Sequence, residues 1–317
     1  MCSSELLARI AAAKVAVLGQ TALLHREFGR AESKWKSDGT RVTATDVAIS
    51  ENIFRELATQ FPADQFFSEE LAATEAPIPV TARFSWVLDP IDGTRLAAYR
   101  LDGAVSVIAA SEPGQMMNCP DVFYMKKLVC GPEGVGLLDI DYSATQNIQN
   151  LADALQKPIS ELSVAVIDKP VNAELIEEVK DSGAHWYRFE EGDIAMAVAA
   201  ATPGSGVDLL LGVGGNPEGV LAACAVRILG GFMQGVLAPR SIEEIEAALN
   251  SGFQLDKKFG LSELVGGTRQ VFVMAGVTDG ILVKGLKVFS ETEMDVQLFV
   301  LDTDIEGGRL FTVRIKR

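Results

Sequence analysis

Two aspartates three residues apart form the group in this sequence with the clearest chemical meaning. Asp89 ends the apolar run Trp86-Val87-Leu88, and Asp92 is followed by Gly93-Thr94, where the chain can turn tightly and start a helix. Pro90 stands between them and ends a strand because it has no N–H to donate. Carboxylates at a strand end suit a divalent cation, and the N–H groups of a helix start suit a phosphate. The stretch predicts a site for a metal-bridged phosphate ester.

Three other acidic residues, Asp46, Glu70 and Glu218, also stand where apolar segments end. Singly, such an acid is usually a helix cap or is solvated. Gathered together with the two aspartates, they would carry about −5, which is costly unless cations neutralise it. Two or three magnesium ions would do so, and the all-oxygen ligand set suits magnesium. Glu69 and Glu70 point to opposite faces of a strand, and we expect Glu70 to reach the metals.

Composition narrows the possible functions. Of 317 residues, 48% are hydrophobic and 22% charged, which indicates a folded globular protein with an ample core. The net charge of −15 argues against nucleic acid or a membrane as a partner. It also repels an anionic substrate unless bound metal ions reverse the local field. The two histidines, His25 and His185, make a catalytic triad or a histidine-rich zinc site improbable.

Cysteine usage and apolar runs predict a cytoplasmic protein. The four cysteines show no C-x-x-C spacing and suit reduced, buried, inert thiols. No apolar run approaches the roughly 20 residues of a membrane span, and the first residues lack a signal-peptide pattern.

Periodicity divides the chain near Ser160, into segments 1–160 and 161–317. The first begins with helical patterns over Ser4–Arg30 and Asp46–Gln60, the latter capped by Thr45 or Asp46. Lys127–Leu138 is strand-like. After Ser160, strand-like and helical segments alternate, among them a helix over Ala173–Lys180 and a strand over Phe232–Leu237, which predicts a parallel sheet covered by helices. The tail consists of strand-like segments, which are Gln270–Val277, Ile281–Val288, Val296–Val300 and Leu310–Ile315.

Two segments resemble motifs of other enzymes. Gly212–Gly219 is similar to a dinucleotide fingerprint, but Pro217 stands where a glycine is needed and suits the first turn of a helix. Leu137–Ser143 resembles the start of haloacid-dehalogenase phosphatases, although a turn with Asp141 or Ser143 capping a helix explains it equally well.

A family resemblance rests on several motifs in order. Asp89–Thr94, with Glu69-Glu70 and Thr45-Asp46 upstream, resembles the magnesium-dependent, lithium-sensitive phosphatases typified by inositol monophosphatase and fructose-1,6-bisphosphatase. Later segments narrow it to class II fructose-1,6-bisphosphatases, including the cyanobacterial type that also acts on sedoheptulose 1,7-bisphosphate. These segments are Asn118–Asp121, Tyr124–Leu128, Ser143–Thr145, Asp168–Pro170, Glu191–Asp193 and Gly212–Val220.

The resemblance implies an α/β (α+β) fold, a layered αβαβα sandwich, with the metals at strand ends. It implies Asp46, Glu70, Asp89, Asp92 and Glu218 as metal ligands, with the Ile91 carbonyl. Asp46, Thr94 and Glu70 become catalytic residues, the first two orienting or deprotonating the attacking water. Substrate contacts are implied at Gly93, Thr94, Tyr124, Lys169, Glu191, Gly192, Asp193 and Gly215.

Three departures set the chain apart from class II. Asp92 replaces the usual glutamate, Ser68–Leu71 replaces G-E-G-E, and Val171 replaces an arginine that resembles a phosphate contact. The first two features, and Lys36–Gly39, are similar to inositol monophosphatases. Loss of a bidentate guanidinium weakens the grip on a second phosphate.

These observations predict a magnesium- or manganese-dependent phosphatase that removes the 1-phosphate of fructose 1,6-bisphosphate through a metal-activated water, without a covalent intermediate. Sedoheptulose 1,7-bisphosphate is a second expected substrate. The alternatives are an inositol or polyol monophosphatase and a non-catalytic sugar-phosphate-binding regulator. The resemblance implies a homodimer or homotetramer.

Overall fold

The structure is a computed structural model that describes residues 4–20, 23–24, 26, 33–35, 41–68, 84–119, 121–290 and 293–316. The chain forms two compact units. Unit 1 holds Met1–Met116 together with Gly267–Arg317, and unit 2 holds Met117–Gly266. None of the helices described is long and apolar enough to cross a membrane.

This division differs from the predicted segments 1–160 and 161–317. Strand pairing explains the difference, because β12 (Gln270–Gly276) pairs with β5 (Val105–Ser111) along its whole length, from Gln270 beside Ser111 to Gly276 beside Val105. The C-terminal strands therefore complete the sheet that the N-terminal segment begins. A single boundary along the sequence cannot separate the two units, because unit 1 contains both the N-terminal and the C-terminal part of the chain.

Unit 1 is organised around a seven-stranded sheet, in which β13-β14-β12-β5-β4-β3 are neighbours and β15 pairs with β14. Neighbouring strands are antiparallel, except that β3 and β4 are parallel. The remaining strands are β3 (Gln65–Ser68), β4 (Ser85–Asp92), β13 (Lys287–Ser290), β14 (Glu293–Asp302) and β15 (Ile305–Lys316). The predicted strand over Ile281–Val288 is wrong for most of its length, since β13 begins only at Lys287.

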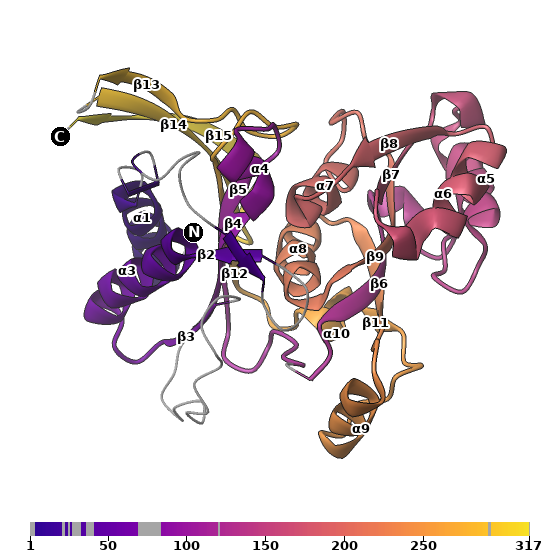
Figure 1. Cartoon of the computed structure of the whole chain (residues 1–317), viewed down its shortest axis with the longest axis horizontal. Coiled ribbons are helices and arrows are strands. Elements are labelled where there is room, and N and C mark those ends of the chain that lie inside the picture. The colour runs from indigo at the N-terminus through magenta and orange to yellow at the C-terminus, as the bar shows by residue number, and fades with distance from the viewer. Residues whose placement is uncertain are drawn as a thin grey trace. The chain divides into compact units, whose positions relative to one another are not determined.

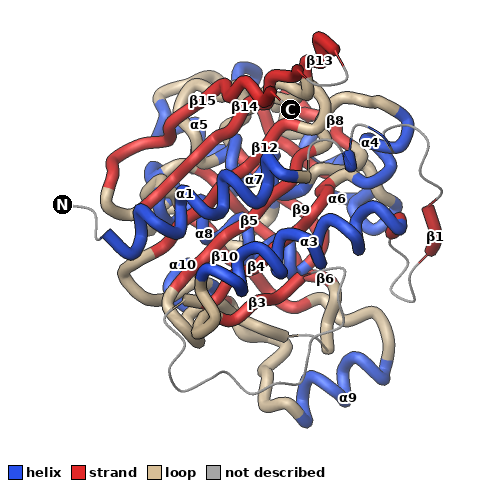
Figure 2. Tube along the Cα trace, turned by 90° about the vertical axis from the view of Figure 1, so that its left-hand side faces the viewer, coloured by secondary structure: helices blue, strands red, loops and turns tan. Residues whose placement is uncertain are grey.

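Two helices, α1 (Ser4–Gly19) and α3 (Ala44–Gln60), lie side by side across one face of this sheet (Figures 1 and 2). Alternate residues of β4, Trp86 and Leu88, are fully buried in the same apolar core as Ile53 and Leu57 of α3. A buried carboxylate, Asp64, links α1 to β4: Arg9 donates to it at 2.7 and 2.8 Å, and the Trp86 indole donates at 2.9 Å. This packing holds β4, the strand that carries the two aspartates.

Short elements complete unit 1. Helix α4 (Thr94–Tyr99) follows β4, and the two-stranded pair β1 (Ser33–Trp35) and β2 (Arg41–Thr43) precedes α3. The cap of α3 is Thr43, whereas the sequence predicted Thr45 or Asp46. The predicted helical pattern over Ser4–Arg30 is confirmed as α1 up to Gly19, and Leu23, Leu24 and Arg26 are helical as well. The other residues of the range beyond Gln20 lie outside the described residues.

Unit 2 contains a six-stranded sheet of order β11-β10-β6-β9-β7-β8. The neighbouring pairs β9–β7 and β7–β8 are parallel, while the pairs β11–β10, β10–β6 and β6–β9 are antiparallel. The four strands of the predicted parallel sheet, β7, β8, β9 and β10, do run in one direction, but β6 and β11 run opposite to them. β6 precedes the βα alternation and enters the middle of the sheet between β10 and β9. The strands are β6 (Tyr124–Cys130), β7 (Ser163–Ile167), β8 (His185–Phe189), β9 (Leu209–Gly215), β10 (Phe232–Leu237) and β11 (Phe259–Gly260).

Helices cover both faces of this sheet (Figure 1). On one face lie α5 (Ala144–Leu155) and α6 (Ala173–Asp181), whose apolar residues form a core with Leu128 of β6 and Val164 and Val166 of β7. On the other lie α7 (Asp193–Ala200) and α8 (Asn216–Ile228). Two further helices, α9 (Ile242–Asn250) and α10 (Leu261–Leu264), follow β10 and β11.

The predicted fold class is confirmed as mixed α/β. Unit 1 supplies one helix layer and one sheet, and unit 2 supplies a sheet between two helix layers. The five layers of the predicted sandwich are therefore present, two in one unit and three in the other.

Candidate active site

The end of β4 carries Asp89 and Asp92, which are both buried. Three residues apart, they would point to opposite faces of a regular strand. The pairing with β5 shifts register between them, so that Asp89 lies beside Val107 and Asp92 beside Val105. Val105 and Val107 are two residues apart and share a sheet face, and directly paired residues share a face as well. The bulge therefore places both carboxylates on one face of the sheet.

Backbone geometry fixes this strand end. Asp89 Oδ1 accepts a hydrogen bond from the Ile91 N–H at 3.1 Å, and the Thr94 hydroxyl donates to the Ile91 carbonyl at 3.2 Å. Gly93 has φ +87°, a conformation that favours glycine, and an added Cβ would lie 3.0 Å from Leu96 Cδ1. The chain can therefore turn from β4 directly into α4, with Thr94 at its first position.

Asp46 lies in the first turn of α3. Its Oδ2 accepts hydrogen bonds from the Thr43 N–H at 2.6 Å and from the Thr43 hydroxyl at 2.9 Å, which completes a capping box. Ser50, one turn further on the same helix face, bonds Ser68 at 2.8 Å. Ser68 ends β3 and lies beside Leu88 of β4, one residue before Asp89. The face of α3 that carries Asp46 thus contacts the strand ends next to the aspartate pair.

The predicted ligand set is distributed over both units. Asp46, Asp89, Ile91 and Asp92 belong to unit 1, Glu218 belongs to unit 2, and Glu70 lies outside the described residues. Within the described part of the chain, no three acidic, histidine or cysteine side chains form a group that could hold a metal ion by themselves. The donors of unit 1 nevertheless suit a hard divalent cation, because two buried carboxylates share one sheet face beside a backbone carbonyl.

The predicted substrate contacts of unit 2 gather at one edge of its sheet. Lys169 follows β7, Glu191 and Gly192 follow β8, and Gly215 ends β9. These three strands are parallel, so their carboxyl ends meet at the same edge. Tyr124 begins the antiparallel β6 and lies directly beside Gly215. Four neighbouring strands thus bring these residues to one edge, and Asp193 begins α7 there.

The turn from β9 into α8 carries Glu218 and depends on glycine. Asn216 fixes the turn: its N–H donates to Phe123 O at 2.6 Å, and its side chain donates to Cys119 O and Val122 O at 3.1 and 3.0 Å. A Cβ on Gly215 would overlap the Glu218 carboxylate, which lies over this backbone. Pro217 occupies the first turn of α8, as the sequence predicted. This position was the reason to set aside a dinucleotide-binding motif.

A buried ion pair joins the β9–α8 turn to α7. Its cation, Lys127, was not among the residues predicted from the sequence. The Lys127 ammonium donates to the Asp193 carboxylate and, at 2.8 Å, to the Gly215 carbonyl. Only 2% of the Lys127 side chain is exposed. Its neighbour Lys126 points to the opposite face of β6 and donates to Ile140 O at 2.8 Å. The sequence does contain a signal for this buried cation, because Lys126 and Lys127 are adjacent in an otherwise apolar strand. Side chains of adjacent strand residues point to opposite faces, so one of the two lysines must face the helices that cover the sheet.

Val171 stands where class II members usually have an arginine. It lies in a short turn after β7 and is 49% exposed. Asn172 ties this turn to β9, because it donates to Val213 O at 3.2 Å and accepts from the Val213 N–H at 2.8 Å. Val171 therefore leaves the turn's structure intact and offers no charge.

The remaining sequence candidates have structural roles. Ser143 caps α5 by accepting from the Gln146 N–H at 3.1 Å, and Asp139 pairs with Lys258, so Leu137–Ser143 is the capped turn that was the alternative to a nucleophile motif. Burial raises the pKa of the Cys130 and Cys224 thiols to about 12, which keeps them protonated and inert.

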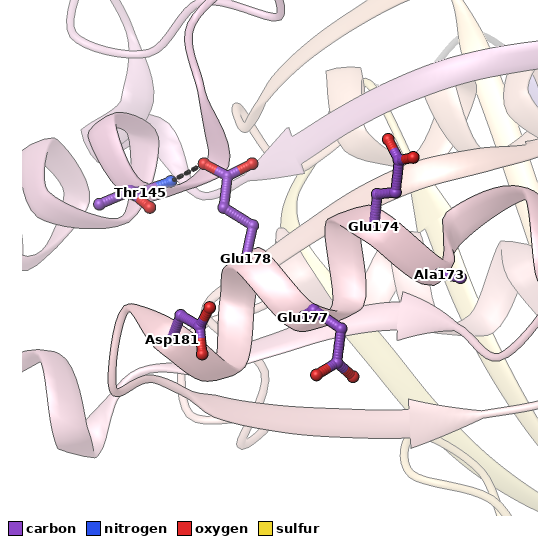
Figure 3. A pocket seen from close by; sticks show the side chains of 6 residues that line it. All are labelled: Thr145, Ala173, Glu174, Glu177, Glu178 and Asp181. Atoms are coloured by element: carbon purple, nitrogen blue, oxygen red, sulfur yellow. Dashed lines mark hydrogen bonds between the residues drawn. The ribbon is translucent and has the colours of Figure 1, made fainter.

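An acidic hollow between α5 and α6 lies apart from these strand ends. It is lined by Thr145, Ala173, Glu174, Glu177, Glu178 and Asp181 (Figure 3). Glu178 accepts from the Thr145 N–H at 2.9 Å, and Glu174 and Glu177 point in opposite directions. The carboxylates diverge rather than converge, so this hollow is not a candidate metal centre.

Comparison with known proteins gives two family matches. Residues 67–312 match the family described as "Bacterial fructose-1,6-bisphosphatase, glpX-encoded", and residues 4–107 match the inositol monophosphatase family. Among solved structures, the extragenic suppressor protein suhB from Bartonella henselae has a TM-score of 0.41 at 18% identity, over 61% of this chain and 75% of that one. An IMPase from Thermotoga maritima has a TM-score of 0.40 at 15% identity, over 60% and 71%. Scores of this size are too low to support an inference.

Three curated relatives carry the name D-fructose 1,6-bisphosphatase class 2/sedoheptulose 1,7-bisphosphatase. The protein of Microcystis aeruginosa is 35% identical over 266 residues, which is 80% of this chain and 73% of the relative. That of Synechococcus sp. is 36% identical over 73% of each chain. That of Synechocystis sp. is 38% identical over 64% of this chain and 62% of the relative, less than two thirds of its length. With the family match over residues 67–312, these similarities show that the chain belongs to the bacterial, glpX-encoded fructose-1,6-bisphosphatase family.

Proposed function

We propose that this chain is a divalent-metal-dependent phosphatase that hydrolyses the 1-phosphate of fructose 1,6-bisphosphate, and that it also accepts sedoheptulose 1,7-bisphosphate. The observation that carries the proposal is its similarity to relatives named for these two activities, 35% identical over 80% of the chain. The bulged end of β4 supports it, because it sets two buried carboxylates on one face beside the Ile91 carbonyl.

Asp89, Asp92, the Ile91 carbonyl and Glu218 would hold the metal ions, with Glu70 and Asp46 as further ligands. Bound magnesium or manganese supplies charge neutralisation and a water of lowered pKa. The Thr94 hydroxyl donates its proton to Ile91 O, so its oxygen can accept a hydrogen bond from the attacking water and orient it. The capping box holds the Asp46 carboxylate in place, where it can accept the proton that the water loses.

Unit 2 would recognise the sugar and its other phosphate. Tyr124, Lys169, Glu191, Gly192, Asp193 and Gly215 are the proposed contacts, together with Gly93 and Thr94 of unit 1. Lys169 suits an anionic group, because its ammonium has no ion pair or hydrogen bond among the residues that the structure describes. The buried Lys127–Asp193 pair would fix the Asp193 side chain and the Gly215 carbonyl relative to one another.

An inositol or polyol monophosphatase is the second candidate. The match of residues 4–107 to the inositol monophosphatase family favours it, as does the exposed, uncharged Val171. Initial rates with fructose 1,6-bisphosphate, sedoheptulose 1,7-bisphosphate and inositol 1-phosphate, each with magnesium and with manganese, separate the two. We expect both bisphosphates to be preferred, and a clear preference for inositol 1-phosphate would overturn the assignment.

A non-catalytic sugar-phosphate-binding regulator is the candidate of another class. It predicts no phosphate release by the purified chain with any of these substrates and metals. We further propose a lithium-sensitive, cytoplasmic homodimer or homotetramer, which inhibition by lithium chloride and light scattering of the purified chain would test.

A further inference from the structure

Arg240 lies at the same sheet edge as the proposed sugar-phosphate contacts, although neither its residue type nor its spacing marked it in the sequence. It follows the carboxyl end of β10, which runs antiparallel to β6 and pairs with it from Phe232 beside Cys130 to Leu237 beside Met125. The next residue, Ala238, donates its N–H to the Tyr124 carbonyl at 2.9 Å. The chain therefore passes Tyr124 just before it reaches Arg240.

The Arg240 guanidinium covers the ring of Tyr124, with its central carbon 3.2 Å from the ring centroid. The Tyr124 ring is itself held by the edge of Phe123, at a centroid distance of 5.0 Å and an interplanar angle of 83°. The Arg240 backbone is held too, because its N–H donates to Glu244 Oε2 at 2.6 Å. A stacked guanidinium keeps its N–H groups in its own plane, where they can donate to a second group.

What distinguishes Arg240 is that no carboxylate neutralises it within the described part of the chain. Its guanidinium has neither an ion pair nor a hydrogen bond there, and the Glu244 carboxylate binds the backbone of Arg240 instead. Other stacked arginines differ: Arg314 lies over Phe289 at 4.3 Å and pairs with both Asp295 and Glu293. In a chain of net charge −15, an arginine held in place without a counter-ion suits an anionic ligand.

We infer that Arg240, stacked on Tyr124, binds the phosphate of the sugar bisphosphate that is not hydrolysed. Arg240 and Lys169, neither of which has an ion pair among the residues that the structure describes, then lie on either side of the Tyr124–Gly215 strand pair, since the sheet order is β10-β6-β9-β7. Arg240 is thus a specificity-determining residue that separates bisphosphates from monophosphates. This inference rests on the proposed function, because it names how the same site recognises its substrate.

Kinetics of Arg240→Ala test the inference. We expect the KM for fructose 1,6-bisphosphate to rise about tenfold, equivalent to about 1.4 kcal/mol, with kcat changed less than about twofold. The KM for p-nitrophenyl phosphate, which has one phosphate, should not change. Arg240→Lys should recover only part of the loss, because an ammonium neither stacks nor binds in the bidentate manner of a guanidinium.

Arg314→Ala is the matched control, since it removes an arginine–aromatic stack from β15 in unit 1. It should leave both KM values unchanged. Equal losses with the two substrates in Arg240→Ala, or an unchanged KM for the bisphosphate, would overturn the inference. Tyr124→Leu should also raise the KM for the bisphosphate, and its effect should add less than fully to that of Arg240→Ala if the ring positions the guanidinium.

Calorimetric binding of fructose 6-phosphate separates this inference from the proposed function. If the purified chain hydrolyses no bisphosphate, the proposed function fails. Binding still tests Arg240, because the product keeps the phosphate in question: a roughly tenfold weaker affinity in Arg240→Ala supports the inference, and an unchanged affinity refutes it.

Discussion

At the scale of single residues, the bulge in β4 explains how a D-P-I-D sequence can present both of its carboxylates together. The residue types could be predicted from the sequence, since two acids and a proline at a strand end suggest a metal site. Their common face could not, because an i, i+3 spacing on a regular strand gives opposite faces. The shift becomes visible only in the pairing of Asp89 with Val107 and of Asp92 with Val105.

Asp89→Asn tests the role of this pair in phosphate release. The amide keeps the shape of the side chain but loses the charge that a divalent cation needs, so kcat/KM for fructose 1,6-bisphosphate should fall on the order of 100-fold or more. Asp181→Asn, in the acidic hollow beside α6, is the matched control and should retain full activity. Unchanged release by Asp89→Asn would mean that the measured activity came from elsewhere.

The Lys127–Asp193 pair shows where residue-level prediction stops. Asp193 could be marked as a contact from its motif, but its cation, Lys127, lies 66 residues earlier in the chain, on β6. Only the fold brings α7 onto the face of β6 that carries Lys127. Sequence patterning could still have separated Lys127 from Lys126, since neighbouring strand residues face opposite sides.

Lys127→Met should destabilise the protein by about 3–5 kcal/mol, because it leaves the Asp193 carboxylate buried without its cation. Urea unfolding followed by circular dichroism measures the change. Lys126→Met is the matched control: its ammonium makes one hydrogen bond from an exposed position, so the loss should be about 1 kcal/mol. Equal losses in the two variants would refute the assigned role, and Asp193→Asn added to Lys127→Met should restore part of the stability.

At the scale of elements, the alternation of apolar and polar residues was enough to predict the strands β7 to β10 and the helices α6 to α8 of unit 2. Phe232–Leu237 was predicted with the bounds that β10 has, and Ala173–Lys180 differs from α6 by one residue. Lys127–Leu138 was predicted as one strand, but β6 ends at Cys130 and a 3₁₀ turn over Pro132–Gly134 follows. Leu138 and Ile140, which follow that turn, pack into the same core as Leu128 and Cys130 of β6, so hydrophobicity alone does not mark the strand's end.

Gly215→Ala tests whether the β9–α8 turn positions Glu218 as a metal ligand. Gly215 has φ −68°, which alanine tolerates, so the backbone should be little strained. The new Cβ would meet the end of a flexible side chain, and the Glu218 carboxylate would have to move. We expect unfolding stability to change by less than about 1 kcal/mol, while the magnesium concentration for half-maximal activity rises at least about tenfold.

Gly260→Ala is the control for that variant. Gly260 also has a negative φ, −84°, and an added Cβ would meet nothing within 4 Å. Its metal dependence should equal that of the unmodified chain. If Gly215→Ala also showed unaltered metal dependence, Glu218 would not be a metal ligand.

At the scale of the whole molecule, the sequence identified the fold class and the strand-like character of the tail, but not which sheet the tail strands join. Strand-like segments in the tail were predicted at Gln270–Val277 and Leu310–Ile315, close to β12 and within β15. No local pattern states that β12 pairs with β5, because the two strands are separated by all of unit 2. Non-local pairing of this kind has no signature in periodicity.

Because the C-terminal strands complete the sheet of unit 1, we can predict how a chain without them should behave. A chain ending at Gly266 keeps every residue of unit 2 but lacks β12 to β15. β5 would lose one of its two antiparallel partners, β12, over seven residue pairs, and the core shared with α1 and α3 would lose Val271, Val273 and Ala275. Because one edge of β5 would be exposed and part of the apolar core would be missing, unit 1 should be unfolded. Hydrogen exchange followed by mass spectrometry should show β4 and β5 amides exchanging freely, while those of β7 and β9 stay protected as an internal reference. Protection of β4 and β5 equal to that in the full chain would mean that the N-terminal segment folds without the C-terminal strands, and that the division of the chain at Met116 and Gly267 has no thermodynamic meaning.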